Sequence, residues 1–418
     1  MTERPPRLLV IMGSGETSPT MSKVHRDLFA RLEPSPVPAA MLDTPFGFQE
    51  NADDIVAKAL AYFRESVGRT VEVSSYRSSA EVGSVDHETS MAQLREARWI
   101  FSGPGSPSHA LRMWRESAVP GLLADKLRSG GCVTFASAAA VTLGRFALPV
   151  YEIYKVGEAP HWIEGLDLMG AIGLRAVVVP HFNNAEGGNH DTRFCYMGER
   201  RLRMLEAELP DDMFVLGVDE HTACVLDLES GRATVAGLGV VTVRVRGTVV
   251  RRIASGESVG IGCLAESGGR DTSAEVGPVA DIAAAAAVAG SPFLEALARL
   301  QETFDTAIEA RDAKTATGCV LDLDDLLVEW SRDTLQSDGI DRGRAELRSM
   351  VVRLGRAAGE GLRDPRDAVG PLVEALLDAR RQARDDRRWS DADAIRDRLV
   401  NAGIEVRDTL GGTEWQVG

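Results

Sequence analysis

Three side chains that could together perform acyl transfer each follow a short apolar run. They are Ser137, His181 and Glu220, and the runs before them are residues 132–135, 176–180 and 213–218. The carboxyl ends of parallel strands meet at one edge of a sheet, where sites commonly form. A serine nucleophile, a histidine base and an acid that orients the histidine are the groups that acyl transfer needs.

The segment around Ser137 has the pattern of a nucleophile elbow. The apolar run passes directly into Ser137, and small residues follow from Ala138 to Ala140. In hydrolases this order of strand, serine and helix places the serine in a strained turn that exposes its hydroxyl. The backbone N–H of Ala138 would lie at a helix N-terminus, where it can stabilise an oxyanion. The alternative is that Ser137 only caps a helix.

Alternatives also stay open for His181 and Glu220. A lone histidine such as His181 is often a buried structural residue. The acid that completes the set is Glu220 or a nearby acid such as Asp191 or Asp219. Glu16 follows the first predicted strand, so we expect it at the same edge of the sheet, in contact with the substrate. The Gly13-Ser14-Gly15 segment before it matches neither phosphate-binding pattern, GxGxxG or GxxxxGK.

Short apolar segments alternate with amphipathic ones through the first half of the chain. The predicted strands cover residues 7–12, 37–42, 70–74, 99–101, 132–135, 176–180 and 213–218, and helices are expected over 52–63 and 107–114. This alternation predicts an α/β fold with a parallel sheet and helices on both faces. Alternating segments over 233–238 and 240–245 are typical of an antiparallel extension at one edge.

The composition changes after residue 262. A polar, glycine-rich stretch over 266–277 indicates a linker, and most of the chain beyond Pro292 has helical periodicity. Two consecutive helices over 372–388 and 390–402 precede a hairpin around Gly411-Gly412. We therefore expect a first domain over 1–262, a linker over 263–291 and an all-α domain ending in a small β-hairpin over 292–418.

The overall composition is that of a soluble chain. The 418 residues carry a net charge of −15, and the five cysteines lie far apart. Separated cysteines fit a reducing cytoplasm and argue against a structural zinc site. The N-terminus lacks a signal-peptide pattern, and no run reaches the roughly 18 apolar residues of a membrane helix. We expect a cytoplasmic protein with no membrane partner and no cofactor.

The first domain resembles the cyanophycinase and dipeptidase E family of serine peptidases, within the class I glutamine-amidotransferase-like fold. The matching segments are MGSGE, FSGPGSP, ASAAA, HF and GVDEHTA. The resemblance implies a flavodoxin-like three-layer sandwich, with Ser137 as nucleophile, His181 as general base and Glu220 as orienting acid. It further implies an oxyanion hole formed by Gly103, Gly105 and Ala138, and substrate contacts by Arg193 and Arg201. Amidotransferases of this fold use a cysteine nucleophile, and Cys132 lies five residues before the elbow, which disfavours amide transfer.

Several positions depart from that family's pattern. FASAAA lacks both elbow glycines, and Pro104 removes one donor from the oxyanion loop. Val179-Pro180 replaces the acidic and amide residues that usually precede the histidine, and NNAEGGNHD separates His181 from Arg193. These changes indicate a reshaped site, so we do not expect cyanophycin or aspartyl dipeptides as substrates.

Residues 372–418 resemble the extreme C-terminus of cysteinyl-tRNA synthetase. The segments that carry the resemblance are RRQAR, WSDADAIRDRL, GIEVRDT and GTEW, and a weaker likeness begins near Phe293. The synthetase region contacts the anticodon end of tRNA, so the candidate RNA contacts are Arg380, Arg381, Arg384, Arg387 and Arg388. Against this, residues 291–418 hold 19 Lys/Arg and 26 Asp/Glu, whereas nucleic-acid-binding domains are usually basic. A solvated helix face or a protein-binding role is the alternative.

The sequence therefore favours a serine-dependent hydrolase acting on an amide or an ester. No HIGH-type ATP motif is present, so aminoacylation is not expected. The fusion of the two domains suggests an aminoacyl-tRNA, a small peptide or another amino-acid-derived substrate. The rival interpretation is a decayed hydrolase that binds tRNA or a protein through residues 292–418.

Overall fold

The computed structural model describes residues 5–187, 190–265, 291–331, 339–359, 365–409 and 412–417. The chain divides into two compact units, one of residues 1–290 with 329–337, the other of 291–328 with 338–418. The domain boundaries predicted at 262 and 292 stay predictions. Most of the predicted linker, residues 266–290, lies outside the described residues.

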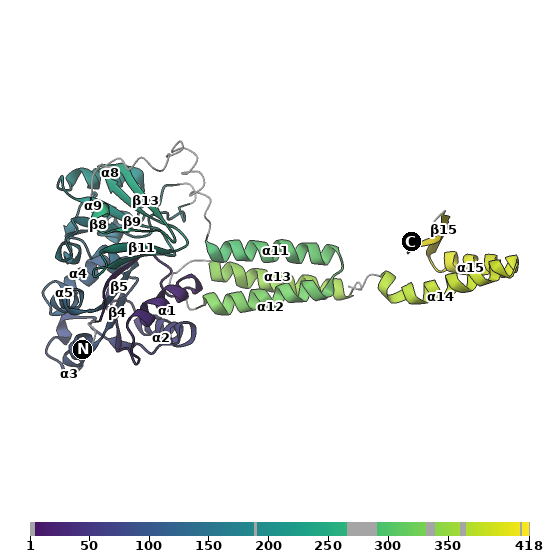
Figure 1. The fold of residues 1–418 in the computed structure, drawn as a ribbon, viewed down its shortest axis with the longest axis horizontal. Helices are drawn as coiled ribbons and strands as arrows, with labels where there is room; N and C mark the ends of the chain where they lie inside the picture. The colour runs from purple at the N-terminus through teal and green to yellow at the C-terminus, as the bar shows by residue number, and fades with distance from the viewer. Residues whose placement is uncertain are drawn as a thin grey trace. The chain divides into compact units, whose positions relative to one another are not determined.

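An eight-stranded sheet forms the centre of the first unit (Figure 1). Its strand order is β14-β11-β10-β1-β5-β4-β2-β3. The parallel part contains β1 (Arg7–Met12), β5 (Gly131–Ala136), β4 (Trp99–Ser102), β2 (Ala39–Leu42) and β3 (Glu72–Ser74). Antiparallel pairings on the other side of β1 add β10 (Thr222–Asp227), β11 (Arg232–Gly237) and β14 (Ser258–Gly260).

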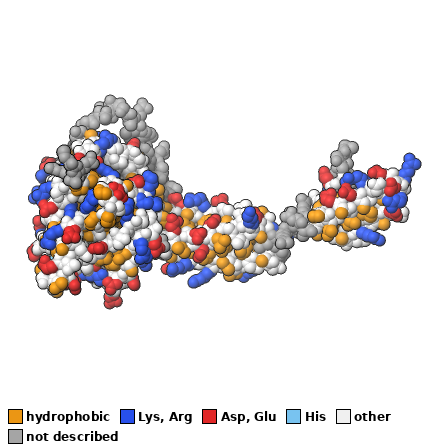
Figure 2. Space-filling model, turned by 60° about the horizontal axis from the view of Figure 1, so that its bottom comes forward, with side chains coloured by type: hydrophobic (Ala, Val, Ile, Leu, Met, Phe, Trp, Pro, Cys, Tyr) orange, Lys and Arg blue, Asp and Glu red, His pale blue; other side chains and the backbone are white. Residues whose placement is uncertain are grey.

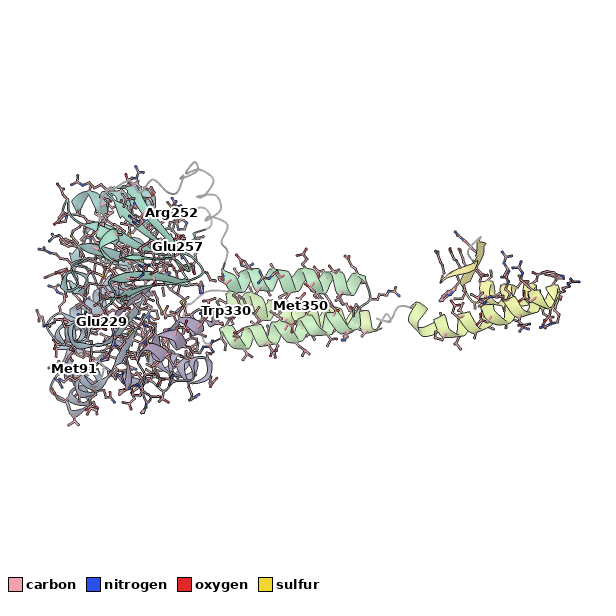
Figure 3. The ribbon with its side chains drawn as sticks, viewed as in Figure 1. Met91, Glu229, Arg252, Glu257, Trp330 and Met350 are labelled. Carbon is pink, nitrogen blue, oxygen red and sulfur yellow. The ribbon has the colours of Figure 1, made fainter. Side chains whose placement is uncertain are left out.

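Alternate residues of β1 belong to two separate hydrophobic cores, because successive strand side chains point to opposite faces. Leu8 and Val10 share one core with α1 (Ser22–Arg31) and α2 (Ala52–Tyr62). Leu9 and Ile11 share the other with α3 (Val85–Glu96), α4 (Pro107–Trp114) and α5 (Val119–Ser129); Met91 of α3, labelled in Figure 3, is buried there. Helices on both faces of a mainly parallel sheet confirm the predicted α/β class.

A second sheet has the order β13-β12-β9-β8. Its strands are β8 (Ala176–Val179), β9 (Phe214–Val218), β12 (Val240–Val245) and β13 (Thr248–Ala254). Val178 and Leu216 join the α3–α5 core, while Val177 and Val215 pack with α8 (Gly198–Glu208). The consecutive strands β11 and β12 thus lie in different sheets, whereas the sequence indicated one extension at a single edge. The chain turns between them at Gly237, where an added Cβ would lie 2.2 Å from the carbonyl oxygen of His221.

Shorter elements complete the first unit. The helices are α6 (Ser137–Val141), α7 (Leu168–Ala171) and α9 (Gly262–Ala265), and β6 (Phe146–Ala147) pairs with β7 (Ile163–Glu164). The 3-10 segments are η1 (Pro19–Met21), η2 (Thr44–Phe46) and η4 (Ser79–Glu81), and the π-helical segments are η3 (Phe63–Val67) and η5 (Glu152–Val156).

The second unit begins with three helices, α11 (Pro292–Glu309), α12 (Ala313–Trp330) and α13 (Gly339–Gly359). Their buried side chains include Leu297, Leu323 and Met350, the last labelled in Figure 3. A Cβ added at Gly343 would lie 2.8 Å from side-chain atoms of both Leu327 and Phe293, so a glycine lets these helices approach closely. Among the helices that the structure describes, none is long and apolar enough to cross a membrane.

The remainder of the second unit contains α14 (Pro365–Asp385), α15 (Trp389–Asn401) and an antiparallel hairpin of β15 (Ile404–Thr409) with β16 (Gly412–Val417). Val373, Leu377, Leu399, Ile404 and Val406 form its core. The indole N–H of Trp415 donates to Glu374 Oε1 at 2.7 Å. The predicted helices and hairpin are confirmed. Gly411 of the predicted turn lies outside the described residues.

The buried ion pair between β12 and α8 supplies a test of packing in the first unit. The Arg244 guanidinium donates to both carboxylate oxygens of Glu206, and the two side chains are 4% and 1% exposed. Removing one charge of a buried pair leaves the other uncompensated, at a cost of about 3 kcal/mol. We therefore expect Glu206→Gln to lower the free energy of unfolding by about that amount in urea titrations.

The matched control is Glu208→Gln, two residues away on the same helix and exposed. Exposed substitutions of this kind change stability by about 0.5 kcal/mol or less. A loss below about 1 kcal/mol for Glu206→Gln would contradict the assigned role of the pair.

Candidate active site

Neighbouring parallel strands of the large sheet end level with one another, so the loops that follow them begin at the same edge of the sheet. Met12 of β1 pairs with Ala136 of β5, and Ser102 of β4 pairs with Phe135. The loops that start at these ends carry Glu16, the 103–105 segment and Ser137. The second sheet contributes His181, just after β8, and Glu220 in the turn from β9 to β10.

Ser137 has the strained backbone that the elbow pattern predicts. Its φ is 49°, a left-handed value, while Ala136 before it is extended and α6 begins at Ser137 itself. The Ser137 hydroxyl lies 2.9 Å from His181 Nε2. The turn forms without either of the glycines that the resembling family carries there.

His181 is held by backbone contacts from the other sheet. Its φ is 49°, and its N–H donates to the carbonyl oxygen of Gly13 at 3.3 Å. A Cβ on Gly13 would lie 2.0 Å from the carbonyl oxygen of Asp219, so only glycine fits where the loops cross. The glycines of MGSGE therefore include one that permits a close backbone approach beneath His181.

Glu220 is the predicted acid that contacts the histidine. Its Oε1 lies 2.8 Å from His181 Nδ1 and accepts from Asn184 Nδ2 at 3.0 Å. The Glu220 N–H donates to Asn183 Oδ1 at 2.8 Å. The two other candidate acids have different partners: Asp219 accepts from the Val240 N–H, and Asp191 binds Arg193.

The pKa values of His181 and Glu220 shift in opposite directions. Burial alone would lower the pKa of His181, but the hydrogen bond and charge of Glu220, with the charges of Glu16 and Glu186, raise it above 6.5. Burial tends to raise the pKa of Glu220, yet His181 and Asn184 lower it overall. Both directions indicate that the pair favours an imidazolium next to a carboxylate.

A cavity of about 420 Å³ opens beside Ser137 and His181. Gly105 and Ala138 line it, as does Pro104. Gly105 has φ 133°, and a Cβ there would lie 2.1 Å from the Pro45 carbonyl oxygen. The N–H of Ala138 lies in the first turn of α6, where a helix provides no acceptor of its own. Gly103 does not line the cavity; its carbonyl accepts the N–H of Ala139.

Three residues were predicted to contact the substrate, and none of them lines the cavity. They are Glu16, Arg193 and Arg201. Glu16 is fully buried, its two carboxylate oxygens have no hydrogen-bond partner among the described residues, and burial raises its pKa. Arg193 binds Asp191 through two guanidinium nitrogens at 2.8 Å. Arg201 lies in α8. Their roles in substrate binding stay predictions.

The cavity wall contains residues that the sequence did not single out. They are Tyr151, Tyr154, Lys155, Glu186 and Tyr196. The Tyr196 hydroxyl donates to Glu186 Oε2 at 2.8 Å. The insertion before Arg193 was a signal for part of this wall, because Glu186 belongs to it. Nothing in the local pattern of 151–155 indicated that this segment faces a site.

A cysteine nucleophile and a metal ion have less support than Ser137. Cys132 is fully buried inside β5, and burial raises the pKa of its thiol to about 12, so it is not poised as a nucleophile. Within the part of the chain that the structure describes, no group of three or more His, Cys, Asp or Glu side chains is arranged to hold a metal ion.

The candidate RNA contacts are not all at the surface. Arg380 is buried, whereas Arg381, Arg384, Arg387 and Arg388 are exposed. Arg381 pairs with Asp378, and Arg388 pairs with Asp386 and Asp391. Figure 2 shows Lys/Arg and Asp/Glu side chains intermixed on the visible face of the C-terminal helices. The four exposed arginines therefore lie in a mixed-charge surface.

The two ends of the chain are similar to different known proteins. Residues 366–415 match a family model described as the cysteinyl-tRNA ligase anticodon binding domain. A solved peptidase from an acI-B1 Actinobacterium is similar over 61% of this chain and 97% of its own, with 19% identity and a TM-score of 0.50. A protein assigned as peptidase E from Listeria monocytogenes EGD-e covers 56% of this chain and 100% of its own, with 16% identity and a TM-score of 0.37.

The family model and the actinobacterial structure confirm the two resemblances at the level of domain and fold. The N-terminal part has the fold of the actinobacterial peptidase, and at 19% identity the likeness shows the fold alone. The match to the anticodon-binding model covers the last two helices and most of the hairpin.

The raised pKa of His181 sets the expected pH dependence. A general base must be neutral, so activity should rise with pH through a midpoint above 6.5. Glu220→Gln removes the charge and acceptor that raise this pKa, so the midpoint should move to lower pH. The maximal rate should also fall by about 10²–10⁴, because the imidazole loses its orienting partner.

The measurement is the rate of acylation by an activated aryl ester between pH 5 and 9. Glu229→Gln, a change on an exposed turn of the same unit, is the control and should leave the midpoint in place. An unchanged midpoint in Glu220→Gln would show that Glu220 does not govern the base.

Proposed function

We propose that the first unit is a serine hydrolase of the peptidase, amidase or esterase type. The observation that carries this proposal is the continuous hydrogen-bonded series from Ser137 through His181 to Glu220 beside an open cavity. The fold shared with the actinobacterial peptidase is consistent with it.

The proposed reaction has two stages, acylation of Ser137 and hydrolysis of the acyl-enzyme. Ser137 Oγ attacks the substrate carbonyl carbon as His181 Nε2 takes the hydroxyl proton. The imidazolium is stabilised by Glu220, and the N–H groups of Gly105 and Ala138 bind the oxyanion. His181 then donates its proton to the leaving amine or alcohol, which departs and leaves an acyl-enzyme. Water releases the acid by the same steps, with His181 again acting as base.

The alternative of a decayed site rests on the altered elbow. Missing glycines and Pro104 are compatible with loss of activity. The strained φ of Ser137 and its contact with His181 favour an intact nucleophile, because such strain persists at sites where it serves function.

The substrate class that gives both ends of the chain a role is an aminoacyl-tRNA or another amino-acid-derived ester. The anticodon-binding family model at 366–415 supports tRNA as the carrier of the acyl group. On this proposal the second unit binds the nucleic acid and the first cleaves the aminoacyl ester, releasing an amino acid and free tRNA. The chain is not expected to synthesise such esters.

Purified wild type should hydrolyse one or more members of a panel of aminoacyl-tRNAs, aminoacyl esters and small peptides. Ser137→Ala should reduce that rate by at least about 10³-fold, since residual rates without the nucleophile are small. The assay measures release of the free amino acid. Equal rates in wild type and Ser137→Ala would contradict a serine mechanism, and activity on peptides alone would exclude the tRNA-linked substrate.

Binding to tRNA is tested separately with the inactive Ser137→Ala chain. Arg381→Ala with Arg387→Ala should weaken binding and reduce the salt dependence of the association constant, because two phosphate contacts are lost. The control pair, Arg26→Ala with Lys58→Ala, makes the same charge change on exposed residues of the first unit. Equal affinity for both pairs would contradict a contact through this arginine run.

A further inference from the structure

Phe194, Cys195 and Tyr196 form one left-handed turn beside the three catalytic candidates. Their φ values are 59°, 55° and 66°. L-residues rarely adopt this conformation, and glycine is the residue that adopts it without a steric penalty. No glycine occupies the three positions, so contacts around the turn must hold it in place.

The turn is bonded directly to the candidate base. The Cys195 N–H donates to the carbonyl oxygen of His181 at 3.2 Å, and the Phe194 N–H donates to that of Phe182 at 3.0 Å. Cys195 and Tyr196 also line the cavity. The turn therefore fixes the backbone of His181 and forms part of the surface that would face a substrate.

Asp191 holds both ends of the turn. Its Oδ1 accepts the N–H of Arg193 at 3.1 Å, just before the turn. Its Oδ2 accepts the N–H of Glu199 at 2.9 Å, just after it. The Arg193 guanidinium binds the same two oxygens at 2.8 Å each, and hydrogen bonding to Arg193 lowers the pKa of Asp191 to about 2.

The Phe194 ring packs against Arg193 and two further side chains. The guanidinium carbons of Arg193 and Arg244 lie 5.0 and 5.1 Å from its centroid, and the Phe182 ring lies 4.5 Å away. Arg244 is itself fixed by Glu199 and Glu206 of α8. An arginine engaged in this way has its planar group committed to protein partners.

We propose that Asp191 and Arg193 are positioning residues that hold the 194–196 turn, and through it His181 and the Tyr196 side of the cavity. This inference rests on the proposed function of Ser137 and His181. It gives Arg193 a task within the protein, in place of the substrate contact that the family resemblance implied.

The test follows labelling of Ser137 by an uncharged fluorophosphonate, measured as the maximal rate (kinact) and the half-saturating concentration (KI). Asp191→Asn and Arg193→Ala should each lower kinact at least tenfold and change KI less than threefold. Arg200→Ala, an exposed neighbour in α8, should stay within twofold of wild type. Adding Cys195→Gly to Asp191→Asn should restore kinact at least threefold, because glycine adopts positive φ unaided.

A folded Asp191→Asn protein that labels at the wild-type kinact would overturn the inference. So would a loss that Cys195→Gly does not restore, because the defect would then not arise from the strained turn. A rise in KI with unchanged kinact in Arg193→Ala would instead assign Arg193 to ligand binding. Absence of labelling in the wild type would remove the proposed function itself, a result distinct from these.

Discussion

The hydrogen bond between Ser137 and His181 depends on how two sheets meet. His181 follows β8 and Glu220 follows β9, both in the small sheet, whereas Ser137 follows β5 in the large one. The chain passes from β9 to β10 across this junction, and Gly13 provides the space for it. The site therefore forms only when the large and small sheets pack together as they do in this structure.

Backbone strain is concentrated at that junction. Ser137, His181 and His221 all have φ values near 50°, in addition to the 194–196 turn. Each such residue costs on the order of 1–3 kcal/mol, which the surrounding packing must offset. The Arg244 guanidinium, which pairs with Glu206, lies 5.1 Å from the Phe194 ring centroid and so packs against the 194–196 turn. The rigidity of the second sheet and α8 is thus tied to the geometry of the site.

The positions of many strands along the chain could be predicted because their signals are local. The apolar runs that became β1, β5, β8 and β9 are short and clearly bounded, and the three candidate catalytic residues follow such runs. The assignment of β11 and β12 to different sheets could not be predicted, because it is decided by packing between segments far apart in sequence. Asn184 escaped notice for the same reason: its partner Glu220 is 36 residues away.

The left-handed turn at 194–196 could not be predicted, because no glycine marks it in the sequence. The pairing of Arg193 with Asp191 was also missed, because the family resemblance assigned Arg193 to the substrate. At the other end of the chain the local signal was strong, and the family model at 366–415 agrees with it. What that end binds depends on its surface, where arginines alternate with acids such as Asp378 and Asp391.

The central claim is that His181 and Glu220 activate Ser137 as a nucleophile. The most direct measurement is the intact mass of the protein, followed by peptide mapping, after treatment with a fluorophosphonate. The account predicts a single adduct on Ser137 that forms in the folded wild type and is absent after prior unfolding or in Ser137→Ala. A folded wild type that gains no adduct, or an adduct located on another residue, would contradict it.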